Sequence, residues 1–448
     1  MEYIQQILFA TVLGAAIWFT AKRVWIIKKT IQLGRPENRS DRPGKRLSTM
    51  LRVAFGQKKM FDRPLVGFMH FIIYAGFLLI NIEVLEIILD GLFGQHRMFA
   101  PFFGSGYLYL LGFFEFLAVG VLTVCVIFLL RRDVVKVDRL QASKHREMKG
   151  WPKLDGNLIL IFEIVLMVAI LTMNAADSVL QDMNSVHYTK AGDFLFSQFL
   201  KPLFAGWSEG SLIVLERGTW WFHIVGILGF AVYVTYSKHL HIALAFPNTY
   251  FARLIPKGEM QNMPEITKEV KIMLGMGEPD AVSADTGTPP AEIARFGAKD
   301  VQDLSWKNLM DSYSCTECGR CTAACPANIT GKKLSPRKIM MDTRDRLEDV
   351  GRNMQANNGA FVDDGKSLLG DYILEEEILA CTTCNACVQE CPILINPLDI
   401  ILQLRRFQIM EEAKAPASWN GMFSNLETSQ APWKFSPADR FNWAEELK

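Results

Sequence analysis

Hydrophobic residues are gathered in long runs in the first 246 positions of the chain and become sparse afterwards. A helix needs about 20 consecutive apolar residues to cross the hydrocarbon core of a bilayer. Five runs reach that length, and they are Ile4–Ile27, Leu65–Leu89, Gly106–Leu130, Leu158–Leu180 and Thr219–Ala245. A soluble core does not require runs of this length, so the pattern predicts five membrane-spanning helices in residues 1–246.

Basic residues are distributed unevenly among the loops that join these runs. The loops after the first and third runs are rich in lysine and arginine, whereas the loop at 90–105 has one such residue and that at 181–218 has three. Because lysine and arginine mark cytoplasmic loops, we expect the N-terminus outside and everything after residue 246 in the cytoplasm. The first run lacks a basic leader and a small-residue cleavage site, so we expect a retained span in a bacterial inner membrane.

The second half of the chain is polar and falls into three parts. Residues 247–305 are predicted to be a linker, because the stretch Val282–Glu292 has the composition of a flexible segment. Residues 306–410 contain helix-like stretches such as Pro336–Glu348. Residues 411–448 have little core of their own, and we expect them to dock a partner through Trp419, Phe423, Trp433, Phe435, Phe441 and Trp443. For Trp419 and Phe423, packing back onto residues 306–410 is an equal alternative.

Eight of the nine cysteines occur in two copies of one spacing, and each copy ends in proline. In the bacterial form of this motif the first three thiolates of a run bind one [4Fe–4S] cluster and the fourth binds the other. We therefore assign the first cluster to Cys315, Cys318, Cys321 and Cys391. The second cluster is assigned to Cys381, Cys384, Cys387 and Cys325.

Zinc and disulfide bonds are the alternatives for these cysteines. Zinc sites usually use separate C-x-x-C pairs, and disulfides need an oxidising compartment. Two four-cysteine runs that end in proline favour clusters instead, which agrees with a cytoplasmic position. The ninth cysteine, Cys125, lies in an apolar run and is expected to serve only packing.

Four of the seven histidines fall in or beside the predicted spans: His70, His223, His239 and His241. Histidine in a bilayer usually has a function, and two facing histidines can bind a haem b from both sides. His70 and His241 share a depth near the cytoplasmic side, whereas His223 lies about 27 Å from His241 along a continuous helix. On such a helix His239 points to another face. We therefore predict His70 and His241 as the axial ligands and His239 as an interfacial anchor.

His223 is left without an assigned role, because the spans offer no second histidine at its depth. It is a candidate for a second haem or for a quinone site. The same outer half contains Glu83, Glu115, Asn174 and Asp177. These polar residues suit a quinone pocket, a proton exit or a hydrogen-bonded packing network. We expect one haem b, with two as the alternative.

The order of the spans and the positions of His70, His223 and His241 resemble the cytochrome b γ subunit of respiratory nitrate reductase. That family binds two haems through two histidines of its second span, and here Ile80 stands at the position of the second histidine. The resemblance therefore implies the inner haem alone. The cytoplasmic half is similar to the heterodisulfide reductase C subunit and to the iron–sulfur part of membrane-bound electron-transfer-flavoprotein:menaquinone oxidoreductases. The matching residues are Ser314-Cys315-Thr316-Glu317-Cys318-Gly319-Arg320-Cys321 and Pro432-Trp433, Asp439-Arg440 and Trp443.

In many such relatives the Pro-Trp segment leads into a module with paired Cys-Cys-Gly motifs, and this sequence contains none. The resemblance implies that this module belongs to a separate cytoplasmic protein of the same complex. It also implies an electron-transfer flavoprotein as a soluble partner and menaquinone as the substrate in the membrane.

The sequence thus predicts an all-α protein, with a five-helix membrane cytochrome b domain at 1–246 and an α-helical ferredoxin domain at 306–410. We expect an electron-transfer subunit that connects a cytoplasmic redox partner with the quinone pool. The alternatives are a quinol-oxidising donor to a cytoplasmic reductase and a redox-sensing or assembly anchor without turnover. The chain contains no nucleotide-binding or triad motif, so no catalytic residue is expected. Its basic loops suit a membrane surface and not a nucleic acid.

Overall fold

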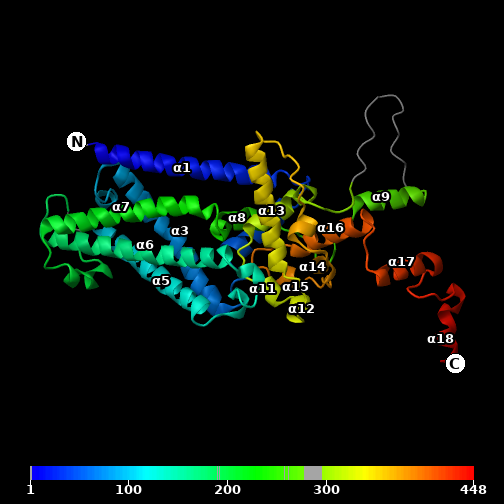
Figure 1. Ribbon diagram of the computed structural model, residues 1–448. Helices are drawn as coiled ribbons and strands as arrows, with labels where there is room; N and C mark the ends of the chain where they lie inside the picture. Colours follow the sequence, from blue (N-terminus) through cyan, green and yellow to red (C-terminus); the bar gives the residue numbers. More distant parts are fainter. Residues whose placement is uncertain are drawn as a thin grey trace.

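The structure is a computed structural model that describes residues 3–188, 190, 192–256, 258–260, 262–276 and 295–447. These residues form helices and no strand, with isolated β-bridges at Arg35–Ser305 and Leu369–Ile373. The prediction of an all-α fold is confirmed for this part of the chain. Figure 1 shows a bundle of long helices with a domain of shorter helices at one end. The predicted flexible stretch Val282–Glu292 lies outside the described residues.

The bundle is built from long apolar helices that follow the predicted runs. They are α1 (Ile4–Ile31), α3 (Pro64–Phe93), α5 (Tyr107–Asp133), α6 (Trp151–Asp182) and α7 (Glu209–Val234). Four segments are long and apolar enough to cross a membrane: α1, α3, α6 and the segment Ala100–Asp133 that includes α4 (Ala100–Phe103) and α5. Among the described residues the span count is four, or five if α7 and the segment after it form one broken span.

The fifth predicted run, Thr219–Ala245, is not one continuous helix, so the assumption of a single helix there was wrong, whereas the count of five spans stays a prediction. α7 ends at Val234, the turn η7 (Lys238–Leu240) follows, and α8 (His241–Tyr250) continues after a bend of 89°. The carboxylate of the buried Asp155 in α6 accepts hydrogen bonds from Ser237 Oγ at 2.6 Å and from the Lys238 amide at 3.2 Å. The sequence remains hydrophobic through this point, but the helix ends there because Asp155 binds the side chain of Ser237 and the amide of Lys238.

The centre of the bundle is a dry apolar core. α6 packs against α5 and α7, and α3 packs against α5. In the most apolar window of α6 half of the residues are buried, whereas in α1 the share is 6%, which leaves α1 mostly exposed at the edge of the bundle. Cys125 is fully buried in this core beside Leu166 and Ile224, as a purely packing role requires.

The smaller domain surrounds a second core. Its helices are α10 (Trp306–Ser314), α11 (Arg320–Ala323), α12 (Pro326–Ile329), α13 (Pro336–Ala356), α14 (Glu375–Leu379), α15 (Ala386–Glu390) and α16 (Pro397–Met410). α13 lies across α10 and α16, and Leu309, Ile339, Leu347 and Leu404 are fully buried between them. Val301 and Leu304, from the predicted linker, are buried in the same core.

The two parts are docked through polar contacts at one end of the bundle. Arg23 of α1 forms an ion pair of 2.6 Å with Glu348 of α13. The fully buried guanidinium of Arg337 contacts Glu147 at 2.8 Å, in the loop between α5 and α6. α2 (Pro43–Met50), η1 (Leu51–Phe55) and α8 complete this contact region.

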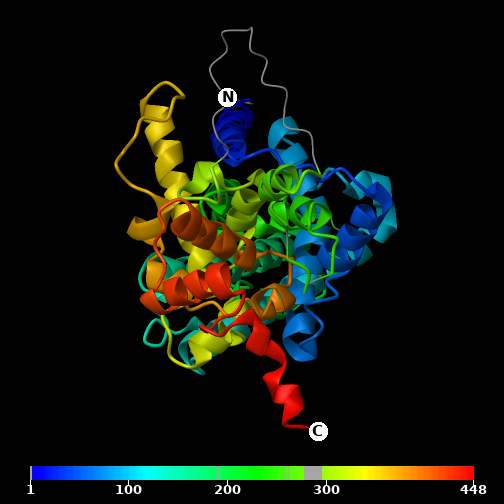
Figure 2. The ribbon, with the colours of Figure 1, turned by 90° about the vertical axis from the view of Figure 1, so that its right-hand side faces the viewer.

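The C-terminal segment extends away from both cores, as Figures 1 and 2 show. It consists of α17 (Ala417–Ser429), η10 (Pro437–Phe441) and α18 (Asn442–Glu445). Trp433, Phe435, Phe441 and Trp443 are exposed, whereas Trp419 and Phe423 are partly covered. α9 (Pro264–Met273) also lies at this end of the molecule (Figure 1).

Candidate cluster and haem sites

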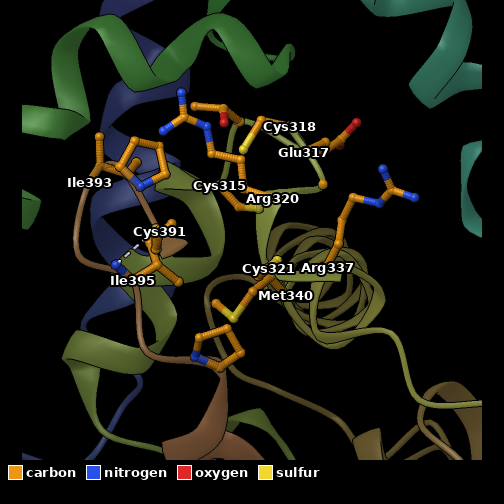
Figure 3. A pocket seen from close by; sticks show the side chains of 14 residues that line it. Cys315, Glu317, Cys318, Arg320, Cys321, Arg337, Met340, Cys391, Ile393 and Ile395 are labelled. Carbon is orange, nitrogen blue, oxygen red and sulfur yellow. Dashed lines mark hydrogen bonds between the residues drawn. The ribbon is translucent and has the colours of Figure 1, made fainter. Parts of the chain in front are cut away.

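A cavity lies where the smaller domain meets the bundle. It is lined by four cysteines, shown in Figure 3: Cys315, Cys318, Cys321 and Cys391. Arg320 and Arg337 also line it, together with Ile393 and Ile395. The amide of Ile395 donates to Cys391 Sγ at 3.2 Å. The structure therefore brings together the four thiols that the sequence assigns to the first cluster.

A second cavity lies between the other four cysteines. It is lined by Cys381, Cys384, Cys387 and Cys325. Each cavity thus takes three cysteines from one run and the fourth from the other. The exchange follows from the packing of α11 against α15, which places the two runs side by side.

The two cysteine loops repeat one backbone conformation. In each loop the second residue after the first cysteine and the residue after the second cysteine are left-handed: Glu317 and Gly319, and Thr383 and Asn385. Such left-handed positions curl the chain so that successive amides face one concave side, which suits an anionic cluster. Asn385 shows that this conformation also accepts asparagine, but at Gly319 a side chain would collide with Arg337 Nη1, which is 2.6 Å from an ideal Cβ.

The geometry separates a cluster from a single metal ion. In the described part of the chain, no three His, Cys, Asp or Glu side chains converge closely enough to hold one ion. The thiols instead surround a space, as the corners of a cube need. Burial raises the pKa of Cys315, Cys387 and Cys391 to about 12, so only a bound cationic centre would keep these sulfurs as thiolates. The donor sets fit two iron–sulfur cubes better than zinc.

The two cavities differ in their access to solvent. Two cysteines of each cavity are buried. The difference lies in the others, because Cys384 of the second cavity is exposed, whereas Cys318 and Cys321 of the first are partly buried. The first cavity faces the bundle and the second lies farther from it. An electron carrier in solution therefore has access to the second cavity.

His70 lies near the start of α3, with its ring held by a hydrogen bond. Its Nδ1 is 3.0 Å from Gln57 Oε1. His241 begins α8, and its Nδ1 is 3.1 Å from the carbonyl oxygen of Lys238. Among the described residues neither Nε2 has a hydrogen bond. A ring nitrogen that donates to an oxygen leaves the other as the metal-binding nitrogen, so both rings fit an axial ligand of haem iron.

The assumption of a continuous helix predicted that His239 lies on a different face from His241. The structure contradicts this prediction. Because the helix breaks, the two ring centroids are 5.4 Å apart, and His239 also contacts Phe230. All three rings lie within electrostatic reach of one another. The distinction between His241 and His239 therefore rests on the Lys238 hydrogen bond and not on helical register.

His223 is buried in the middle of α7, away from these three rings. Its Nδ1 is 3.1 Å from the carbonyl oxygen of Leu166 in α6. Ile80 of α3 packs in the same apolar core, so no second histidine faces His223 across the bundle in the described residues. The structure brings His70 and His241 together but leaves His223 alone.

The first cysteine loop is connected to both histidine-bearing segments. Lys238, whose carbonyl holds His241, forms a short ion pair with Glu317 between Cys315 and Cys318. Glu317 also pairs with Arg344 at 2.7 Å.

On the other side of the cavity, the link runs to the segment before α3. Arg320 donates to the carbonyl oxygen of Lys59 at 3.0 Å, and Lys59 Nζ donates to the Cys391 carbonyl at 2.8 Å. Gln57, two residues before Lys59, holds His70. Sequence reasoning missed Gln57, Lys59, Lys238 and Glu317. In the sequence, Lys238 and Glu317 stand next to a histidine and a cysteine, whereas Gln57 and Lys59 carry no such signal.

These features define a class: a two-cavity, eight-cysteine domain docked on an apolar helical bundle. Residues 314–395 match the family described as the 4Fe-4S dicluster domain. The chain therefore contains a dicluster iron–sulfur domain.

Curated proteins match more of the chain. It is 27% identical to the probable iron-sulfur-binding oxidoreductase FadF of Bacillus subtilis, over 98% of this chain and 61% of that protein. It is 26% identical to the EtfAB:quinone oxidoreductase of Syntrophomonas wolfei, over 94% of this chain and 56% of that protein. Over 24% of the chain and 52% of the relative, it is 33% identical to a CoB-CoM heterodisulfide reductase C subunit of Methanosarcina acetivorans.

The chain thus spans about three fifths of the length of the first two relatives. No solved structure matches it. The predicted similarity to the heterodisulfide reductase C subunit and to quinone-linked iron–sulfur oxidoreductases is confirmed. The similarity of the bundle to a cytochrome b stays a prediction.

Proposed function

We propose that this protein is a membrane-bound electron-transfer subunit that connects a soluble redox partner with the quinone pool, with menaquinone as its membrane substrate. Two [4Fe–4S] clusters and one b-type haem would supply the one-electron chemistry. The first cluster would be held by Cys315, Cys318, Cys321 and Cys391, and the second by Cys381, Cys384, Cys387 and Cys325. His70 and His241 would hold the haem.

The observation that carries the proposal is the connection between the first cavity and the two histidines. Lys238 contacts His241 through its carbonyl and Glu317 through its ammonium group. The segment of Gln57 and Lys59 contacts His70 and Arg320. Spacing and electrostatic tuning are what a protein contributes to a redox chain. These contacts would set the spacing and the electrostatic environment between the first cavity and the bundle.

The membrane orientation is proposed from the same contacts. The basic loops after α1 and after α5 dock on the iron–sulfur domain, through Lys59 and through Arg139, which donates to the Cys318 carbonyl at 2.9 Å. Because the loops and the cluster domain are docked, they lie on the same side of the membrane. The bias of basic residues toward cytoplasmic loops then places the cluster domain in the cytoplasm as well. His223 would be a packing residue with a hydrogen bond to α6 and not the ligand of a second haem.

The proposed soluble partner approaches from the side of Cys384 and the exposed C-terminal segment. An electron-transfer flavoprotein is the candidate carrier, since one relative is named EtfAB:quinone oxidoreductase. A separate subunit with the Cys-Cys-Gly module is the second candidate.

The variant Lys238→Met tests the connection between the first cavity and His241. Removal of the ammonium leaves Glu317 less compensated, which should lower the midpoint potential of the first cluster by on the order of 50 mV, the equivalent of ~1.2 kcal/mol in a one-electron couple. A potential-poised EPR titration measures this shift. Lys333→Met is the matched control, because Lys333 pairs with Glu376 at an exposed position. An equal potential in both variants would contradict the proposed role of Lys238.

A further inference from the structure

The bundle has one end that lies opposite the iron–sulfur domain (Figure 1). A buried polar network lies toward that end, between α3, α5 and α6. Glu83, Glu86 and Asp90 of α3 have the spacing i, i+3, i+7, which places them on one helix face. Their exposed fractions are 7%, 3% and 8%. Ionisable residues inside a membrane protein are costly and usually functional.

Arg97, in the loop after α3, is the centre of this network. Its Nε is 2.8 Å from Asp177 Oδ2 and its Nη2 is 3.0 Å from Asn174 Oδ1. Its Nη1 also reaches the Tyr107 hydroxyl at 3.5 Å. That hydroxyl donates to both oxygens of Glu86 at 2.9 Å. Arg97 thus connects α3, α5 and α6.

Two further carboxylates are held by neutral donors. Asp90 accepts from the amides of Arg97 at 3.0 Å and Met98 at 2.9 Å. Glu115 of α5 accepts from the Phe196 amide at 2.7 Å and from Asn174 Nδ2 at 3.1 Å. Neutral donors satisfy oxygens but supply no countercharge.

The network therefore has more acids than bases. Its five carboxyls surround one guanidinium, that of Arg97: Glu83, Glu86, Asp90, Glu115 and Asp177. The neighbouring helices add no spare cation, because on α7 Arg217 pairs with Glu216 at 2.5 Å, and α1 contributes the neutral Gln6. In a medium that excludes charge, a carboxylate without a countercharge is costly.

Two polar groups are left without a partner, and they lie at the two ends of the network. The Glu83 carboxyl has no hydrogen bond or ion pair within the described residues, although it lies in electrostatic reach of Arg97, Glu86 and Glu115. At the outer end, His96 is partly exposed with Nε2 3.5 Å from Asp177, and its buried Nδ1 has no partner. A buried polar atom in a network built only for packing would normally have a partner, and His96 Nδ1 has none.

We propose that this network is a proton path from the aqueous side at His96 to the bilayer interior at Glu83, with Asp177, Tyr107 and Glu86 between them. The inference rests on the proposed function, since it assigns the path to quinone turnover. A quinone takes up two electrons and two protons as two O–H bonds form. The electrons come from a reduced soluble carrier through the iron–sulfur domain, and the protons enter from the opposite side. Glu83 lies about 20 Å from His70 along α3, at 1.5 Å per residue.

The first test measures the Glu83 proton directly and needs no quinone. The complete protein is placed in vesicles with the iron–sulfur domain facing outward, and infrared spectra record the C=O band of protonated carboxyls. Glu83→Gln should remove one band. The matched control Glu163→Gln removes an intramembrane carboxyl of α6 outside this network and should leave that band unchanged. The band should follow the pH of the vesicle lumen. A band that follows the outer solution, or no band assigned to Glu83, would overturn the path.

The second test connects the path to turnover. After reduction by dithionite from outside, a menaquinone analogue reoxidises the protein. Glu83→Gln should slow this reoxidation about 100-fold, with dithionite reduction unchanged and partial recovery in Glu83→Asp. An unchanged rate in Glu83→Gln would refute the path and leave the proposed function standing. If the analogue fails to reoxidise the wild type, the proposed function fails, and the infrared result alone decides the path.

Discussion

Single residues connect the two halves of this molecule. Lys238 uses its carbonyl for a histidine and its ammonium group for the cysteine loop. Arg337 is fully buried and contacts Glu147, in a loop of the bundle. Gly319 leaves the space that Arg337 occupies. The cysteines could be assigned to clusters from the sequence because each run is a short, continuous motif. These partners could not, because they come together only when distant segments dock.

Exchange of the fourth cysteine can be tested with Cys325→Ser. Because Cys325 lines the second cavity, the cluster there should be lost or altered, while the first cluster persists. Iron analysis and EPR of the reduced protein distinguish the two. Cys125→Ser is the control, since Cys125 lies in the bundle core. Selective loss of the first cluster in Cys325→Ser would show that each run binds its own cube.

The docking contact of Glu147 can be tested by stability. Glu147→Gln leaves the buried Arg337 charge without its partner, which should destabilise the domain by about 3–5 kcal/mol. Thermal loss of cluster absorption measures this. Glu376→Gln, at an exposed ion pair with Lys333, should cost at most about 1 kcal/mol.

The same contact has a pH dependence of defined sign. Burial alone would raise the pKa of Glu147, but Arg337 and Ser335 outweigh it and the pKa lies below the usual 4.5. A depressed pKa stabilises the fold above pH 4.5, and that stability is lost as the pH falls through the lowered value. The difference between wild type and Glu147→Gln should therefore shrink on acidification below pH 4.5. A constant difference would show that the ion pair is not the cause.

At the scale of helices, hydropathy located four of the bundle helices within a few residues and failed at the fifth. A run of hydrophobic residues does not show where a helix bends. It could not predict that Asp155 accepts hydrogen bonds from Ser237 and Lys238 or that the chain bends by 89° there. His70 and His241 were paired because they were expected at a similar depth in the membrane. The break in the helix does not change this, since both residues lie at the docked end of the bundle. The argument that His239 points to another helix face fails, because it assumed a continuous helix.

Haem content tests the element-scale account. His70→Ala and His241→Ala should each abolish the haem, because one axial ligand is lost, while the clusters remain. His223→Ala should retain one haem, since its ring bonds to Leu166 and faces no second histidine. A pyridine haemochrome assay measures each. Loss of haem in His239→Ala, with retention in His241→Ala, would exchange the roles of these two residues.

For the whole molecule, the arrangement is a line: an exposed cavity, a buried cavity, the docked histidines and the polar network at the far end. The C-terminal segment extends away from the rest of the molecule (Figure 2). Composition indicated both halves and their order in the chain. It could not show that Val301 and Leu304 of the predicted linker belong to the iron–sulfur core.

The C-terminal segment is expected to dock the soluble partner, because it exposes Trp433 and Trp443 at 69% and 62% of their surface. Deletion of residues 430–448 should leave the clusters and the haem in place and remove a cysteine-rich or flavin-containing partner on purification. Full co-purification of the same partner with the truncated protein would assign docking to another surface.

The central claim is that two clusters and one haem form a single path to the quinone pool. A potential-poised optical and EPR titration of the purified protein tests it most directly, with a menaquinol analogue as the final reductant. We predict two [4Fe–4S] clusters and one b-type haem per chain, and a haem that the quinol reduces. A protein with clusters but no haem, or with a haem that quinol does not reduce, would contradict the account.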